Sequence, residues 1–128
     1  TEVLPLLEDV LGGGVAEALA RTATALREDT DALDAIAEEV SAGRGADGDL
    51  AIAMLTPLAG AVRRRVIRSW LLAGGACGLT DGQIRGVDAL VTAWRGQGGV
   101  AVPSRSSRER LFAGRRGGAL TLYREPVN

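Results

Sequence analysis

The chain has 128 residues, enough for one domain with a real core and too few for two large domains. It contains no histidine and a single cysteine, Cys77, for which we expect a small buried or half-buried thiol. This composition excludes the Ser-His-Asp and Cys-His nucleophile systems, most transition-metal sites and an internal disulfide. The sequence has no apolar run that would span a membrane and no visible secretory leader, so we expect a cytoplasmic protein.

Charge is divided unevenly along the chain. Residues 1–50 hold three arginines and 12 acids, whereas residues 51–128 hold 12 arginines and four acids, although the net charge is only −1. The first part could neutralise the second within the molecule, or the second part could face a polyanion.

The first half of the chain predicts helices. Residues 2–11 form an apolar segment that ends at a run of glycines, and a long helix is expected from Val15 to about Ser41. An apolar stripe repeats every seven residues along this helix, at Leu19, Leu26, Leu33 and Val40. The stripe fits either a coiled-coil seam or, as we favour, packing against the later helices of the same chain.

Two further helices are expected before the pattern changes. The first covers about residues 50–73, and Pro57 either kinks it or marks the first turn of a new helix. The second begins at Thr80, which forms a capping-box pattern with Gln83, and runs to about Trp94 with that residue on its buried stripe.

From residue 100 the period becomes two, which is typical of strands. Residues 100–103 predict a short strand, and residues 109–113 and 119–123 predict a β-hairpin around a glycine-rich turn. The expected fold class is therefore mostly α (α+β): a helical bundle with one long helix and a small C-terminal antiparallel β-hairpin or sheet. We expect the helical bundle in residues 1–98 and the β subdomain in residues 99–128.

No motif in the chain predicts an active site. The glycine-rich segments lack the phosphate-loop pattern, and the chain has no lysine to complete one. The paired acids of the long helix, Glu38 with Glu39 and Asp29 with Asp31, are interpreted as a solvated face. We therefore predict no catalytic residue and no metal site.

Arginines are the candidate binding residues. On a helical wheel Arg64, Arg65 and Arg68 lie together, opposite the apolar face of their helix. Arg63 lies at the edge of that apolar face, so we expect it to stack on Trp70 or to pair with an acid of the long helix.

A second basic cluster lies in the predicted hairpin. Arg115 and Arg116 stand near its turn, where side chains are expected to project freely. The arginine fork suits phosphate, so we predict that both clusters contact nucleic acid; the alternative for the hairpin is a charged edge that keeps it soluble. Only four aromatic residues are present, so binding by base stacking is not expected.

Three segments together resemble a known family. They are residues 2–34, PLAGAVRRRVIRSWLLAGG at 57–75, and GGVAVP at 98–103 with GGALTL at 117–122. In this order they are similar to the part that follows the catalytic domain in the tRNA(Ile)-lysidine synthetases. Members of that family are ATP-dependent ligases that convert the wobble cytidine of tRNA(Ile) to lysidine.

The resemblance implies a tRNA-binding and positioning domain, with Arg64, Arg65, Arg68, Arg115 and Arg116 on the RNA. The family's nucleotide loop, S-G-G-x-D-S, is absent from this chain. ATP, lysine and the catalytic residues are therefore expected in an upstream domain, no cofactor is expected in this chain, and whether the chain alone is an enzyme stays open. The alternatives are a structural or dimerisation helical module, which would make a homodimer, and a regulatory domain for an acidic protein.

Overall fold

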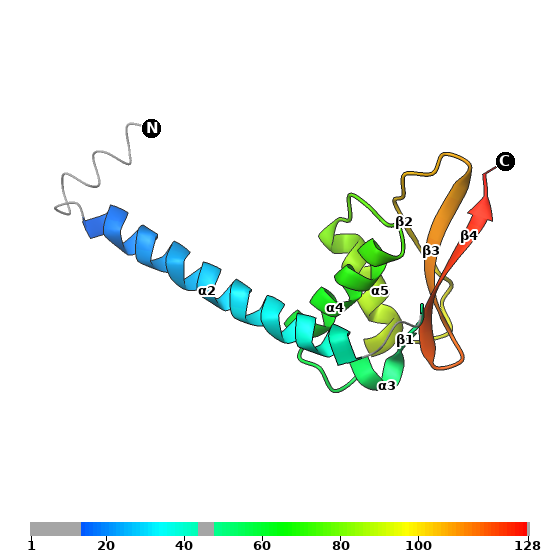
Figure 1. The fold of residues 1–128 in the computed structure, drawn as a ribbon, viewed down its shortest axis with the longest axis horizontal. Helices are drawn as coiled ribbons and strands as arrows, with labels where there is room; N and C mark the ends of the chain where they lie inside the picture. The colour runs from blue at the N-terminus through cyan, green and yellow to red at the C-terminus, as the bar shows by residue number, and fades with distance from the viewer. Residues whose placement is uncertain (1–13, 44–47, 128) are drawn as a thin grey trace. The chain divides into compact units, whose positions relative to one another are not determined.

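The computed structural model describes residues 14–43 and 48–127 (Figure 1). The chain divides into two compact units, Thr1–Asp34 and Ala35–Asn128. The apolar segment predicted at residues 2–11 lies outside the described residues. None of the described helices combines the length and the apolar character that crossing a membrane requires.

The long helix α2 covers Gly14–Gly43, which confirms the predicted element and extends it slightly at both ends. Leu19 and Leu26 of its apolar stripe are 57% and 62% exposed, and Ala37 is its buried residue. The exposure of these two leucines does not decide between a coiled-coil seam and packing against the later helices of the chain. Both interpretations of the stripe therefore stay predictions.

Of the two alternatives for residues 50–73, one helix kinked at Pro57 is wrong; a new helix does begin after Pro57, although at Gly60 and not at the proline itself. The structure has a strand β1 at Leu50–Ala51, a one-turn helix α3 at Ile52–Leu55 and then α4 at Gly60–Ala73. Pro57 lies in the turn between the two helices, because it has no N–H to donate to a continuous helix. Leu50 lies in a strand and not in the predicted helix, because it pairs with Leu120 in the sheet.

Helix α5 covers Asp81–Thr92, and its start is as predicted. The Gln83 N–H donates to Thr80 Oγ1 at 3.2 Å, and the Thr80 N–H donates to Gln83 Oε1 at 2.8 Å, which completes the capping box. The predicted position of Trp94 is wrong: the helix ends at Thr92, and Trp94 is 41% exposed instead of buried. The backbone of Ala93 leaves the helical region, which takes Trp94 off the apolar stripe.

Four antiparallel strands form one sheet in the order β1-β4-β3-β2. Strand β2 covers Val100–Val102, β3 covers Glu109–Arg116 and β4 covers Ala119–Pro126, so the predicted short strand and hairpin are confirmed. The turn is only Gly117 and Gly118, whose φ angles of 57° and 80° suit glycine in a tight two-residue hairpin loop.

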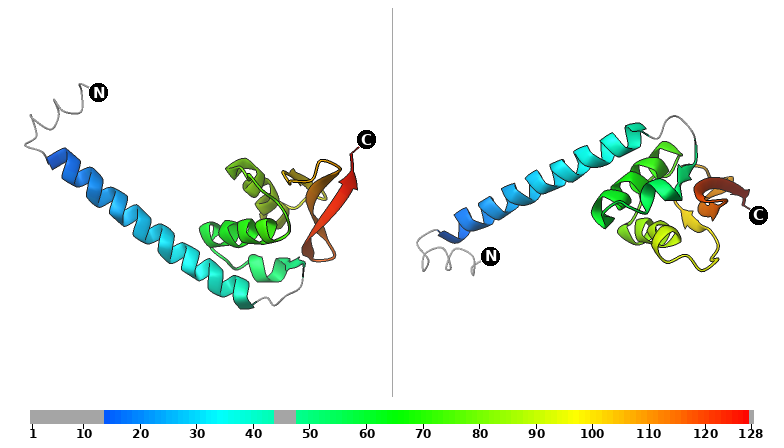
Figure 2. Two further views of the ribbon diagram at one scale, coloured as in Figure 1. Left: turned by 45° about the horizontal axis from the view of Figure 1, so that its top comes forward. Right: turned by 90° about the horizontal axis from the view of Figure 1, so that it is seen from below.

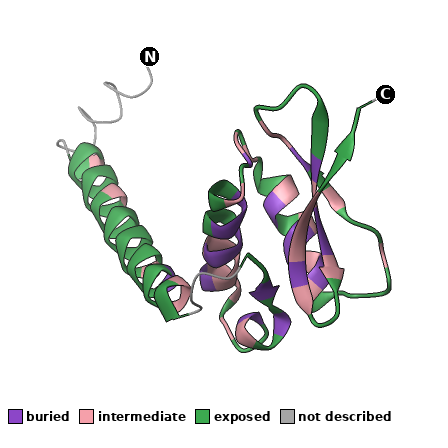
Figure 3. Cartoon of the chain, turned by 45° about the vertical axis from the view of Figure 1, so that its right-hand side comes forward, coloured by how far each residue is buried: buried purple, intermediate pink, exposed green. Residues whose placement is uncertain are grey.

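Helices α4 and α5 lie on one face of this sheet (Figure 2). Buried residues occur on α4 and α5 as well as on the strands of the sheet (Figure 3). The largest fully buried side chains come from both layers and are Leu50, Leu55, Val66, Ile67, Leu71, Val87, Leu90, Leu111 and Leu120. The mixed α+β class is confirmed, whereas the division into residues 1–98 and 99–128 stays a prediction.

Candidate nucleic-acid interface

A groove of about 270 Å³ runs between α4 and α5. Its lining contains the three predicted arginines of α4 together with Arg85 and Asp81 of α5. The remaining lining residues, Ala61 and Ile84, are small or apolar. The groove therefore brings four guanidinium groups and one carboxylate to a single surface.

Arg63 is held away from this groove by a buried ion pair with Asp88 of α5. Its Nε donates to Asp88 Oδ1, its Nη2 donates to Oδ2 at 3.2 Å, and its Nη1 donates to the Leu58 carbonyl at 2.9 Å. The two side chains are only 11% and 10% exposed. The hydrogen bond to Asp88 raises the pKa of the Arg63 guanidinium above its usual value, despite the opposing effect of burial.

This geometry confirms that Arg63 is a structural residue, but its partner is not the one we expected. The partner is an acid of α5, instead of Trp70 or an acid of the long helix. Asp88 comes directly after the buried Val87 and four residues after the buried Ile84. An acid on the apolar face of a helix is the sequence signal for a buried ion pair, since a lone buried carboxylate is unfavourable.

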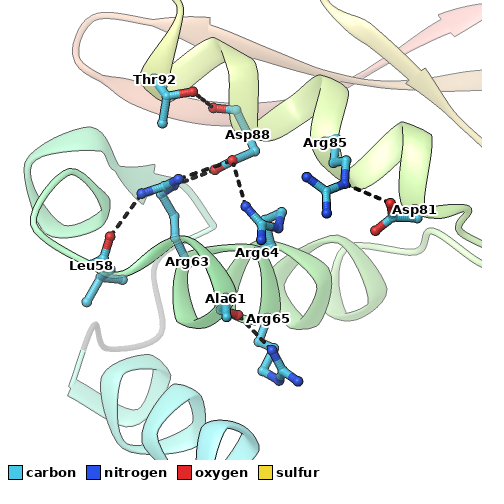
Figure 4. A network of polar contacts seen from close by, with 9 residues as sticks. All are labelled: Leu58, Ala61, Arg63, Arg64, Arg65, Asp81, Arg85, Asp88 and Thr92. Carbon is cyan, nitrogen blue, oxygen red and sulfur yellow. Dashed lines mark hydrogen bonds and ion pairs between the residues drawn. The ribbon is translucent and has the colours of Figure 1, made fainter. Parts of the chain in front are cut away.

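Arg64 connects the buried pair to the groove. Its Nη1 lies 3.6 Å from Asp88 Oδ2, and its side chain stays 28% exposed (Figure 4). The space for this arrangement comes from Gly60, because a Cβ there would lie 2.9 Å from Arg64 Nη1. Arg64 thus presents a partly shielded cation whose position is set by a neighbouring carboxylate.

The other groove arginines differ in their surroundings. Arg65 Nη1 donates to the Ala61 carbonyl of its own helix at 3.0 Å, and Arg68 is exposed. Arg85 Nε donates to Asp81 Oδ2 at 2.7 Å, with the two side chains 59% and 77% exposed. An exposed pair of this kind contributes only about 0–1 kcal/mol, so an incoming anion can compete for Arg85.

Sequence reasoning missed Arg85 as a groove residue. Arg85 forms an ordinary i, i+4 pair with Asp81, which is typical of a solvated helix face. Only the packing of α5 against α4 places it beside the arginines of α4.

The hairpin arginines lie in β3 and do not project freely, which corrects that expectation. Arg115 Nη1 donates to the Leu90 carbonyl at 3.0 Å, and its guanidinium lies 5.2 Å from the centre of the Trp94 ring. Arg116 lies 4.4 Å from the centre of the Tyr123 ring. Neither lines the groove, and as adjacent strand residues they lie on opposite faces of the sheet, so the five predicted arginines do not share one surface.

The described part of the chain gives little support for a metal site or a reactive cysteine. Within residues 14–43 and 48–127, no three histidine, cysteine, aspartate or glutamate side chains cluster closely enough to hold a metal ion. Cys77 is half-buried, as expected, and carries no disulfide. The groove remains the feature with a defined ligand chemistry, because planar guanidinium groups bind phosphate through paired donors.

The fold and the groove define a small α+β domain with an arginine-lined groove between two helices. Residues 50–118 match the family described as the TilS substrate binding domain. The tRNA(Ile)-lysidine synthase of Mycobacterium tuberculosis is 70% identical over 99% of this chain and 41% of its own length. Proteins of the same name from Mycobacterium leprae and Nocardia farcinica are 65% and 58% identical over 98% of the chain and 39% of their lengths.

The chain belongs to this tRNA(Ile)-lysidine synthase family, in the part that contains the TilS substrate binding domain. The family resemblance of the three sequence segments is therefore confirmed. The chain spans about two fifths of the length of the curated relatives that it matches.

Proposed function

We propose that this chain binds and positions tRNA(Ile) for an ATP-dependent ligase that converts the wobble cytidine to lysidine. The observation that carries the proposal is the groove in which Arg64, Arg65, Arg68 and Arg85 meet. ATP, lysine and the catalytic residues belong, in this proposal, to an upstream domain of the same cytoplasmic protein. In this proposal Arg115 and Arg116 also contact the RNA, outside the groove.

Charge in this part of the chain supports a polyanionic ligand. Residues 48–127 hold 12 arginines and five acids, and one of the acids, Asp88, is already paired with Arg63 and Arg64. Clustered cations repel one another by a few tenths of a kcal/mol per pair on a helix surface, and a phosphate removes that cost. RNA supplies phosphates in a row, which matches cations placed one turn apart on α4.

Removing two groove arginines is expected to weaken the salt dependence of tRNA binding. In a full-length protein that carries this chain, we expect Arg64→Ala with Arg68→Ala to reduce the slope of log Kd against log salt by about 1.4 to 1.8, since each phosphate contact contributes about 0.7 to 0.9. The measurement is a titration with tRNA(Ile) at several salt concentrations.

The matched control is Arg21→Ala with Arg27→Ala, which removes the same charge from α2. Both control residues are exposed and lie outside the groove. We expect this control to keep the wild-type slope within about 0.3. If the groove variant also keeps the wild-type slope, the groove does not bind RNA phosphates.

A second candidate function is dimerisation through α2, for which Leu19, Leu26, Leu33 and Val40 provide a stripe at heptad spacing. Apolar side chains at heptad spacing can pair between two copies of one helix. Sedimentation of the chain over a hundredfold range of concentration tests this candidate. A mass that stays at that of one chain excludes the homodimer, and a shift toward two chains that Leu26→Glu abolishes supports it.

A further inference from the structure

The two tryptophans of the chain have opposite environments. Trp70 is 3% exposed, and its indole Nε1 donates to the Gly48 carbonyl at 2.6 Å, so it is a core residue with its polar atom satisfied. Trp94 is 41% exposed just beyond the end of α5. Among the residues that the structure describes, nothing accepts a hydrogen bond from its indole nitrogen. A large apolar ring and a free donor are therefore available at one surface position.

A fixed cation lies against this ring. The Arg115 guanidinium is 5.2 Å from the ring centre, and its Nη1 is held by the Leu90 carbonyl at 3.0 Å. Anchoring by a backbone carbonyl limits the freedom of both side chains before any ligand arrives. A pre-positioned ring loses little entropy on binding, which favours its use as a stacking surface.

The surroundings of Trp94 are cationic. Residues 89–108 contain no acid, and the next residue, Arg95, is exposed. Arg116 follows Arg115 in β3 but lies over Tyr123 on the opposite face of the sheet, since side chains alternate along a strand, so it is not part of these surroundings. Cations next to an aromatic ring are the combination that holds single-stranded nucleic acid, with bases on the rings and phosphates on the cations.

The sequence analysis discounted base stacking because aromatic residues are few. The structure changes that argument, since three of the four aromatic rings each have an arginine of β3 against them. The pairs are Arg110 with Phe112, Arg115 with Trp94, and Arg116 with Tyr123. Of these rings, Phe112 and Tyr123 stack on each other at 5.4 Å, whereas Trp94 has no aromatic neighbour in the described part of the chain.

We propose that Trp94 stacks on an unpaired nucleobase of bound tRNA, while Arg95 takes an adjoining phosphate. This inference rests on the proposed function, and it adds a site that the groove arginines do not provide. Arg115 acts here as a positioning residue, because it holds the ring in place.

Binding of tRNA(Ile) by the full-length protein tests the proposal. Trp94→Leu keeps an apolar side chain but removes the π-face, so Kd is expected to rise about tenfold. Trp94→Phe keeps a π-face and is expected to stay within about threefold of the wild type. Neither variant is expected to change the salt slope, because stacking releases no counterions. A Trp94→Leu protein that unfolds at the wild-type temperature and binds tRNA as tightly as the wild type would overturn the proposal.

Fluorescence gives a second measurement that does not depend on a destabilising variant. The emission of Trp94 is the difference between the wild type and Trp94→Phe. We expect acrylamide to quench this emission in the free full-length protein. We expect much weaker quenching when tRNA is bound, because the stacked base covers the ring. If Trp94 is already shielded in the free protein, another part of the protein covers it and the proposal is wrong.

The two proposals fail in different ways. If Arg64→Ala with Arg68→Ala lowers the salt slope but Trp94→Leu binds normally, only the stacking site is refuted. If the wild-type protein does not bind tRNA(Ile), both proposals are refuted.

Discussion

Replacing Asp88 with alanine is expected to lower the free energy of unfolding of the chain by about 3 to 5 kcal/mol. Asp88 accepts two hydrogen bonds from Arg63, and both side chains are about nine-tenths buried. Without Asp88 the Arg63 guanidinium keeps its charge but has only the Leu58 carbonyl as a partner. A buried charge without a counter-ion is the reason for the large effect. Urea denaturation of the variant and the wild type measures it.

Asp81→Ala is the matched control, because it removes the other α5 aspartate that pairs with an arginine. Its ion pair with Arg85 is largely exposed, so we expect a loss of at most about 1 kcal/mol. Replacing both members of the buried pair, with Arg63→Met and Asp88→Leu, is expected to recover most of the lost stability, since no buried charge remains. Equal losses for Asp88→Ala and Asp81→Ala would contradict the buried position of the Arg63–Asp88 pair.

Leu50→Ala is expected to cost about 2 to 5 kcal/mol of unfolding free energy. Leu50 is fully buried, although it lies in a strand of only two residues. Its pairing with Leu120 attaches β1 to the edge of the sheet, where α3 follows directly. Truncation would leave a cavity between the sheet and the helices. The midpoint and slope of urea unfolding give the change.

Leu26→Ala is the control of the same chemistry on an exposed face. Leu26 is 62% exposed on α2, so its truncation is expected to change the unfolding free energy by no more than about 0.5 kcal/mol. A loss below 1 kcal/mol for Leu50→Ala would show that β1 is not part of the core.

Elements whose stabilising contacts are local could be predicted from sequence. The capping box of α5 joins residues three apart, and the hairpin turn depends on two adjacent glycines that adopt positive φ. The length of α2 follows from its apolar spacing and the absence of proline. Each of these signals lies within one or two turns of chain, where spacing alone decides which groups meet.

Elements that depend on distant partners could not be predicted in this way. Leu50 joins a strand because Leu120, seventy residues later, offers it a paired edge. The apolar pattern of residues 50–55 suits a helix equally well, so only the sheet decides between the two structures. Trp94 shows the same limit at the end of α5, where the backbone leaves the helix before the apolar stripe is complete.

For the candidate site, the sequence by itself determined that Arg64, Arg65 and Arg68 share a surface, and it predicts arginines as the ligand-binding groups. Only the tertiary structure decided that Arg63 pairs with Asp88 outside the groove, that Arg85 lines the groove, and that Arg115 lies on Trp94. The physical reason is that composition and helical period determine which residue types are present and which face they share. The partner of each charge depends on how α4, α5 and β3 pack, and these contacts join residues about 25 positions apart.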